Sequence, residues 1–320
     1  MPVSIATSPN SSVSKSSYSQ IDSNQQYGIV LGCPRSGTTY VSRLLATIPE
    51  FESMIGTLLP VAVPHVVNQP ISQSVYEALA IGFERSLDEY LHSGRYHSRA
   101  MAVQKWFNAP TGIRGLYRAL FRPRSRPECM IYKEPVLAFA PEFALDAFPS
   151  GRILHIYRDG RDCANSLVST YDVLTDEKLR NPLSTEARIG RRYDDRFVPW
   201  WVKKGQDDEF MRSTPYVRSI WMWAYMVRRC HEVFTGKSAS SSPNVMQVRY
   251  EDLVRDPHKY GHKIVHFFGG NPTKALDKLL SSAHTASIGK HKRRDPVEIG
   301  AAEEVAAAEL ELYGYPVGQL

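Results

Sequence analysis

Short apolar runs alternate with amphipathic segments along most of the chain. Four apolar runs are typical of buried strands, namely residues 28–31, 130–132, 152–157 and 245–248. Apolar side chains recur at helical spacing in other stretches, residues 38–47, 142–148, 162–170, 219–234 and 303–315. Short apolar strands that alternate with helices usually pair in parallel and are covered on both faces. The pattern therefore predicts an α/β fold of three layers, with a central parallel sheet flanked by helices.

Other segments depart from this pattern. Residues 1–26 are rich in Ser, Asn and Gln and hold few large apolar side chains, so we expect a disordered tail. Residues 27–320 are expected to form a single domain, because α/β folds of this length often form one unit. Residues 68–126 and 175–215 have weaker patterns and are expected to be helical or loop insertions. The second is polar and rich in Arg and Asp, which favours a lid or a ligand-binding loop.

Charge, apolar runs and cysteine spacing indicate which partners and which compartment to expect. A net charge of +6 suits an anionic ligand, but the basic residues are scattered, so nucleic acid is not an expected partner. The sequence has no secretion signal and no apolar run near the about 18–20 residues that cross a bilayer. We therefore expect a cytoplasmic protein without a membrane partner. The four cysteines form no CxxC pair, which predicts free thiols and no zinc site built on cysteine.

A glycine-bounded loop comes directly after the first predicted strand and opens a predicted helix. It reads Gly32-Cys33-Pro34-Arg35-Ser36-Gly37-Thr38-Thr39. Glycines let backbone N–H groups converge on an anion, and the N-terminus of the helix favours negative charge. The alternative is a tight turn that only caps a structural helix.

This loop is close to the GxxxxGK[ST] loop of ATPases, with one change. Thr38 stands in the lysine position, and the cation is Arg35 inside the loop. An internal arginine suits a group shorter than a triphosphate, such as one phosphate with a sulfate attached. We expect this group to be bound by the last five residues of the loop, Arg35, Ser36, Gly37, Thr38 and Thr39.

A second candidate phosphate site follows the predicted strand 152–157. Arg158 comes at the end of the strand, and Ser166 follows eight residues later in a predicted helix. An arginine fork and a hydroxyl can converge on one phosphate. The alternative is an ordinary helix start in which Asp159 and Asp162 act as cap or dipole partners.

Together, the two motifs resemble those of sulfotransferases that use 3′-phosphoadenosine-5′-phosphosulfate (PAPS). The loop is similar to the family's 5′-phosphosulfate loop, in the arginine form of the bacterial and tyrosylprotein-like branches. Arg158 and Ser166 resemble the motif that holds the 3′-phosphate. The resemblance implies a P-loop fold and transfer of the sulfuryl group of PAPS to a hydroxyl of an organic acceptor, with adenosine 3′,5′-bisphosphate as the other product. One nucleotide can bridge both motifs only if they share one cleft.

Three further motifs resemble the same family. Lys133 is similar to a lysine that the family places at the transferring sulfate; a surface lysine at a strand end is the alternative. Ser287 and Lys290 resemble a loop that closes over the cofactor; a solvated basic loop is the alternative. Residues 249–253 resemble a segment with a mainly structural role.

The resemblance also implies how the reaction proceeds. Arg35 and Lys133 would supply the positive charge, so no metal is expected. The tyrosylprotein branch has a glutamate base after the first helix, but the comparable stretch 53–59 holds no carboxylate. His65 is the candidate base because imidazole titrates near neutral pH.

Several alternatives stay open. Two other candidates for the base are Glu52 and Glu134. The missing glutamate base and membrane anchor favour a small-molecule acceptor, such as a hydroxylated secondary metabolite, over a protein tyrosine; a glycan or a lipid headgroup is the alternative. Other classes of protein are a P-loop kinase or NTPase, which would need a lysine after Gly37 and Mg²⁺, and an inactive nucleotide-binding module.

Overall fold

The computed structural model describes residues 26–55, 62–92, 129–181, 190–236 and 244–318. The predicted tail lies outside these ranges except for residue 26, and so does the second part of the predicted insertion 68–126. None of the described helices is both long and apolar enough to cross a bilayer.

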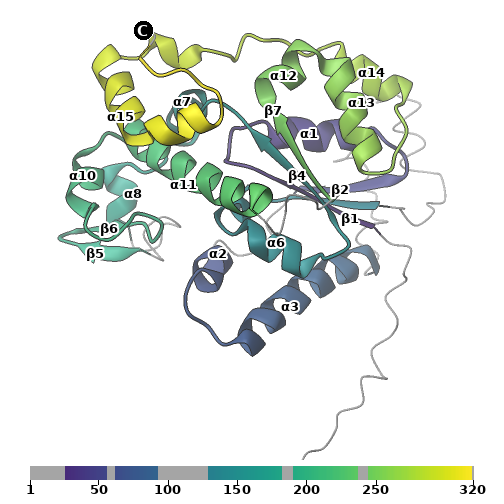
Figure 1. The fold of residues 1–320 in the computed structure, drawn as a ribbon, viewed down its shortest axis with the longest axis horizontal. Helices are drawn as coiled ribbons and strands as arrows, with labels where there is room; N and C mark the ends of the chain where they lie inside the picture. The colour runs from purple at the N-terminus through teal and green to yellow at the C-terminus, as the bar shows by residue number, and fades with distance from the viewer. Residues whose placement is uncertain (1–25, 56–61, 93–128, 182–189, 237–243, 319–320) are drawn as a thin grey trace, which may run out of the picture.

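Among the described residues, five parallel strands form the central sheet in the order β2-β3-β1-β4-β7 (Figure 1). The strands are β1 (Gln26–Leu31), β2 (Phe51–Ile55), β3 (Cys129–Lys133), β4 (Arg152–Tyr157) and β7 (Val245–Arg249). Four of them correspond to the four predicted apolar runs. The sequence did not predict β2, which mixes polar and apolar residues and lies at one end of the strand order.

Helices cover both faces of the sheet, as predicted. One face packs against α1 (Thr38–Leu45), α12 (Tyr250–Arg255), α13 (Pro257–Phe267) and α14 (Lys274–Leu280). The other packs against α3 (Gln73–His92), α6 (Pro141–Ala147), α7 (Gly160–Tyr171), α11 (Pro215–Thr235) and α15 (Pro296–Leu312). Side chains of β4 alternate between the two cores, with Leu154 and Ile156 in one and Ile153 in the other. The three-layer α/β fold is therefore confirmed.

The described part of the segment 175–215 is ordered around a small core of its own. It contains α8 (Asp176–Arg180), the hairpin β5 (Arg191–Tyr193) and β6 (Arg196–Val198), and α10 (Asp207–Arg212). Its apolar side chains form a cluster that includes Leu179, Val198 and Phe210. Arg218 of α11 lies beneath this cluster and donates to the carbonyl oxygens of Leu174, Phe210 and Met211.

The strand order places both candidate phosphate motifs at one point of the sheet. The chain runs from β1 to strands on one side of it, whereas β4 and β7 lie on the other side. Ligands of open α/β sheets bind at such a switch point, beside the carboxyl ends of the strands. The loop 32–37 follows β1, and Arg158 follows β4, which pairs directly with β1.

Candidate active site

The loop between β1 and α1 has a backbone that glycine makes possible. Gly37 has a φ of 107°, and a Cβ atom there would lie 2.5 Å from the Tyr250 ring. A Cβ atom at Gly32 would lie 2.1 Å from the carbonyl oxygen of Ile156. Ser36 is buried beneath the loop, and its hydroxyl has no hydrogen-bond partner among the described residues. The loop is therefore tightly packed, and the Ser36 hydroxyl beneath it is available as a hydrogen-bond donor.

Arg158 extends from the end of β4 and is held against the loop. Its guanidinium donates to the carbonyl oxygen of Arg35 at 3.2 Å and to that of Ser287 at 2.5 Å. It also lies over the Tyr250 ring, 4.8 Å from the ring centroid. Its Nε is buried and has no partner among the described residues, so the side chain keeps a donor for a ligand.

Arg35 joins the two predicted motifs directly. Its Nε donates to the Ser166 hydroxyl at 2.9 Å, and its NH1 group donates to the Tyr171 hydroxyl at 3.2 Å. Arg35 has a φ of 73°, which turns its side chain out of the loop in a left-handed conformation. The loop and helix α7 therefore lie within the reach of a single side chain.

A cavity of about 390 Å³ lies between the motifs. Eight of the nine predicted cofactor-binding residues line it: Arg35, Gly37, Thr38, Thr39, Arg158, Ser166, Ser287 and Lys290. The ninth, Ser36, is the buried serine of the loop. The structure thus brings together residues that are up to 255 positions apart in the sequence.

The C-terminal loop is fixed to this cavity by Asp162, a contact that the sequence analysis missed. The Asp162 carboxylate accepts hydrogen bonds from the backbone N–H groups of Gly289 (2.7 Å) and His291 (3.0 Å) and interacts with His291 Nδ1 at 2.9 Å. Burial opposes the charged form of Asp162, but these hydrogen bonds and the nearby Arg158 lower its pKa. The carboxylate is therefore charged at neutral pH and holds Ser287 and Lys290 at the cavity.

A sequence model of the sulfotransferase family matches residues 29–212, more than half of the chain. The chain belongs to the sulfotransferase family. The matched residues include the loop after β1, Lys133, Arg158 and Ser166. No curated protein sequence matches the chain significantly.

Several solved structures resemble this sulfotransferase. The sulfotransferase domain of the olefin synthase of Synechococcus PCC 7002 is 18% identical, with 92% of this chain and 96% of that one covered and a TM-score of 0.46. Sulfotransferase STF9 from Mycobacterium avium is 14% identical, with 92% and 78% covered and a TM-score of 0.45. The sulfotransferase domain from the curacin biosynthetic pathway is 14% identical, with 91% and 98% covered and a TM-score of 0.45.

The predicted lysine of this sulfotransferase lies at the end of β3, on the other side of β1 from Arg158. Lys133 pairs in register with Val30 of β1, and burial lowers its pKa, partly offset by Glu134. Of the described residues, Lys133 is not among those that line the 390 Å³ cavity. The Glu134 carboxylate accepts from the Tyr132 hydroxyl at 2.8 Å and from Val136 N–H at 3.3 Å, as expected for a cap of the 3₁₀ helix η2 (Pro135–Phe139).

His65 lies on the short helix α2 (Ala62–Val67), outside the lining of the cavity. Its ring centroid is 5.3 Å from that of Trp200, and its buried Nδ1 has no partner among the described residues. Burial lowers the pKa of His65, which favours the neutral imidazole that a base requires. Glu52 is buried in β2. The later part of the stretch compared with the glutamate base, residues 56–59, lies outside the described residues.

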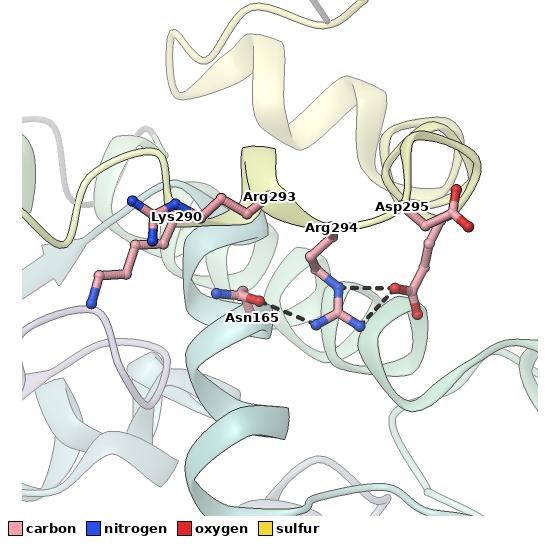
Figure 2. A pocket seen from close by; sticks show the side chains of 6 residues that line it. Asn165, Lys290, Arg293, Arg294 and Asp295 are labelled. Atoms are coloured by element: carbon pink, nitrogen blue, oxygen red, sulfur yellow. Dashed lines mark hydrogen bonds and ion pairs between the residues drawn. The ribbon is translucent and has the colours of Figure 1, made fainter.

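Figure 2 shows the lining of a second cavity of about 390 Å³. Two of its lining residues, Asn165 and Lys290, also line the first cavity. Arg294 connects two other residues that line this cavity: it donates to Asn165 Oδ1 at 3.1 Å and to Glu298 at 2.6 Å. The charge of Arg294 is therefore compensated within the sulfotransferase itself, whereas Lys290 is exposed.

Two further residues of the site were missed because their roles depend on distant parts of the chain. Tyr250, which the sequence analysis treated as part of a structural segment, lines the first cavity and bonds Ser287 Oγ at 2.9 Å. Tyr171 lies under Arg35, 5.3 Å from the guanidinium to the ring centroid. A tyrosine directly after a buried strand was the available signal for Tyr250; we find no comparable signal for Tyr171.

Proposed function

We propose that this sulfotransferase takes the sulfuryl group from PAPS and transfers it to a hydroxyl of a small-molecule acceptor, such as a hydroxylated secondary metabolite. The observation that carries the proposal is the shared cavity between the loop after β1 and the Arg158–Ser166 pair. PAPS carries two anionic groups on its ribose, the 5′-phosphosulfate and the 3′-phosphate, and each motif offers positive charge and hydroxyls to one of them.

The residues present fit such a ligand. The cavity is lined by Arg35, Arg158 and Lys290, while the carboxylate of Asp162 is already engaged by the C-terminal loop. The Ser36 hydroxyl and Arg158 Nε are buried donors without a partner among the described residues. A buried polar group without a partner is costly, and an anionic ligand would relieve that cost. The Arg35–Ser166 hydrogen bond opens when a ligand takes its place.

In this account PAPS supplies the activated sulfuryl group, and the protein supplies charge and position. The loop N–H groups, Thr38 and Thr39 hold the 5′ end, and Arg158 and Ser166 hold the 3′-phosphate. Arg35 and Lys133 stabilise negative charge that develops on the transferring group and on the phosphate that leaves. The acceptor hydroxyl loses its proton to a base of the protein.

We assign the role of the base to His65. Its neutral imidazole can accept a proton, whereas both oxygens of Glu134 already accept hydrogen bonds. A wild-type plot of kcat/KM against pH should then fall on the acid side, below the ordinary histidine pKa of about 6.5. His65→Ala should remove that acid limb, and an unchanged profile would rule His65 out.

The test of the function itself is product formation. The full-length chain is incubated with PAPS and a panel of hydroxylated acceptors, and mass spectrometry searches for sulfated products. We expect a sulfate ester with at least one acceptor, and none when ATP and Mg²⁺ replace PAPS. A phosphorylated product with ATP would indicate a kinase. Binding of adenosine 3′,5′-bisphosphate without any sulfated product would indicate an inactive module.

A further inference from the structure

Two histidines and one aspartate meet where α13 packs against α14, outside both cavities described above. His258 and His262 are one helical turn apart on α13, and Asp277 lies on α14. One ligand atom from each of the three residues lies within 4.8 Å of the other two. His262 Nε2 is 2.7 Å and His258 Nδ1 is 3.5 Å from Asp277 Oδ1. The three side chains thus converge on one small volume.

The two helices that carry these residues are held closely together. A Cβ atom at Gly261, between the two histidines, would lie 2.4 Å from a Leu280 methyl carbon of α14. Leu276 and Leu280 of α14 are fully buried in the core beneath α1. The backbone positions of the three side chains are therefore fixed by packing, and only their exposed or half-buried ends can adjust.

We propose that His258, His262 and Asp277 bind a divalent transition-metal ion such as Zn²⁺. Zn²⁺ takes imidazole nitrogens at about 2.0–2.1 Å and carboxylate oxygens at about 2.0–2.2 Å, so neighbouring ligand atoms of a tetrahedral site are about 3.3 Å apart. The 3.5 Å separation is close to this value, the 2.7 Å separation is shorter, and all three ligand atoms lie within 4.8 Å of one another, so side-chain adjustment would complete the site. Water fills the remaining position, as in other sites with three protein ligands.

The donor set also selects the kind of metal. Two imidazoles and one carboxylate suit zinc and its late first-row neighbours, whereas Mg²⁺ and Ca²⁺ prefer sites made of oxygen ligands. The metal would join α13 to α14, whose buried face packs with α1, the helix that follows the phosphate loop. The three residues lie apart from those that line the active-site cavity. The sequence analysis, which expected no metal, considered cysteine pairs and not the His-x₃-His spacing on a helix.

The test uses the full-length chain without a histidine tag, stripped with a chelator and titrated with ZnCl₂ in a calorimeter. We expect saturable binding of one Zn²⁺ per chain and a higher thermal unfolding midpoint when zinc is present. His258→Ala, His262→Ala and Asp277→Asn should each weaken this binding at least as much as loss of an outer-shell partner does, about 10–100-fold.

His266→Ala is the matched control, because His266 lies one turn further along α13 and bonds the Gly270 carbonyl oxygen outside the three-residue group. This variant should bind zinc like the wild type. The proposal is wrong if the wild type shows no saturable zinc binding, or if the three ligand variants and the His266 variant bind zinc equally. Far-ultraviolet circular dichroism of each metal-free variant checks that loss of binding is not loss of the fold.

Discussion

At the scale of single residues, Arg35 connects the two motifs that the proposed reaction uses. In the structure, its side chain crosses from the loop after β1 to Ser166 on α7. It thus lies between the two motifs proposed to hold the 5′-phosphosulfate and the 3′-phosphate, and its backbone is in the left-handed region. Because the side chain already reaches the cavity, it has only to exchange its bond to Ser166 for a ligand to stabilise charge there.

Arg35→Ala tests this role. Removal of one preorganised donor to a developing charge costs about 10²–10³-fold in kcat, and we expect a loss of that size or larger in sulfuryl transfer. Alanine meets the same backbone requirement, so the fold should persist. Arg192→Ala, which removes an exposed arginine of the β5–β6 hairpin, is the control and should leave turnover unchanged. Turnover of the Arg35 variant close to that of the wild type would show that Arg35 is not catalytic.

His155 gives a prediction for stability. It is fully buried in β4, where burial lowers its pKa to about 4 although Gln247 partly opposes the change. Between about pH 6.5 and pH 4 the unfolded chain therefore binds a proton that the folded chain does not, and stability falls as the pH falls. Between about pH 7 and about pH 5, the titration of His155 should lower the free energy of unfolding of the wild type by about 2 kcal/mol.

Urea unfolding of the wild type and of His155→Phe over this pH range measures the effect. Phenylalanine does not titrate, and the rings of Tyr157, Phe234 and Tyr313 offer it an aromatic environment. The free energy of unfolding of the variant should fall less on the acid side than that of the wild type. Parallel curves would mean that the pKa of His155 is the same in the folded and the unfolded chain.

The predicted site residues that line the cavity share one property. Arg35, Thr38, Arg158 and Ser166 stand in short motifs whose chemistry is local in sequence, immediately after a buried strand. The sequence offered Asp162 only as an alternative, a cap or dipole partner of a helix, because its partners lie more than 120 positions away in the C-terminal loop. Such a contact is specified by the packing of the whole fold, and no periodicity within one segment reveals it.

At the scale of the elements, α7 and α11 pack closely against each other. A Cβ atom at Gly160, the first residue of α7, would lie 2.4 Å from the Trp223 ring. Trp223 is buried, and its indole N–H donates to the Arg158 carbonyl oxygen at 3.1 Å. The contact between these two helices therefore also positions the end of β4, where the proposed 3′-phosphate site begins.

Gly160→Ala should push α7 away from Trp223 of α11 and destabilise the protein by about 1–3 kcal/mol, as overpacking usually does. Gly300→Ala is the matched control: Gly300 is in helix α15, and a Cβ atom there meets no atom within 4 Å. That variant should be stabilised by about 0.5–1 kcal/mol, because alanine favours the helix. Denaturant unfolding of both variants measures the two changes, and equal effects would contradict the packing argument.

The elements that could be predicted are those buried on both sides. β1, β3, β4 and β7 are near-continuous apolar runs because helices cover both faces of a parallel sheet. β2 lies at one end of the strand order, and the polar Glu52 and Ser53 within it obscure the apolar run. The short hairpin β5–β6 depends on packing against α8 and α10, which local sequence does not specify.

At the scale of the whole molecule, strand order decides where the chemistry is placed. The carboxyl ends of β3, β1 and β4 are adjacent, so Lys133, the glycine loop and Arg158 start from one edge of the sheet. The sequence predicted the parallel sheet but not the order of its strands, because pairing between distant strands leaves no local signal. The central claim, that one nucleotide is held by both motifs, depends on this order.

The most direct measurement is the contribution of the 3′-phosphate to binding. Calorimetry compares adenosine 3′,5′-bisphosphate with adenosine 5′-monophosphate in the wild type, in Ser166→Ala and in Arg158→Ala. Hydrogen bonds to charged groups contribute about 1.5–3 kcal/mol, so the wild type should bind the bisphosphate at least about tenfold more tightly. Both variants should lose most of that preference while their affinity for the monophosphate changes little. Equal affinity of the wild type for the two nucleotides, or equal weakening of both in the variants, would contradict the account.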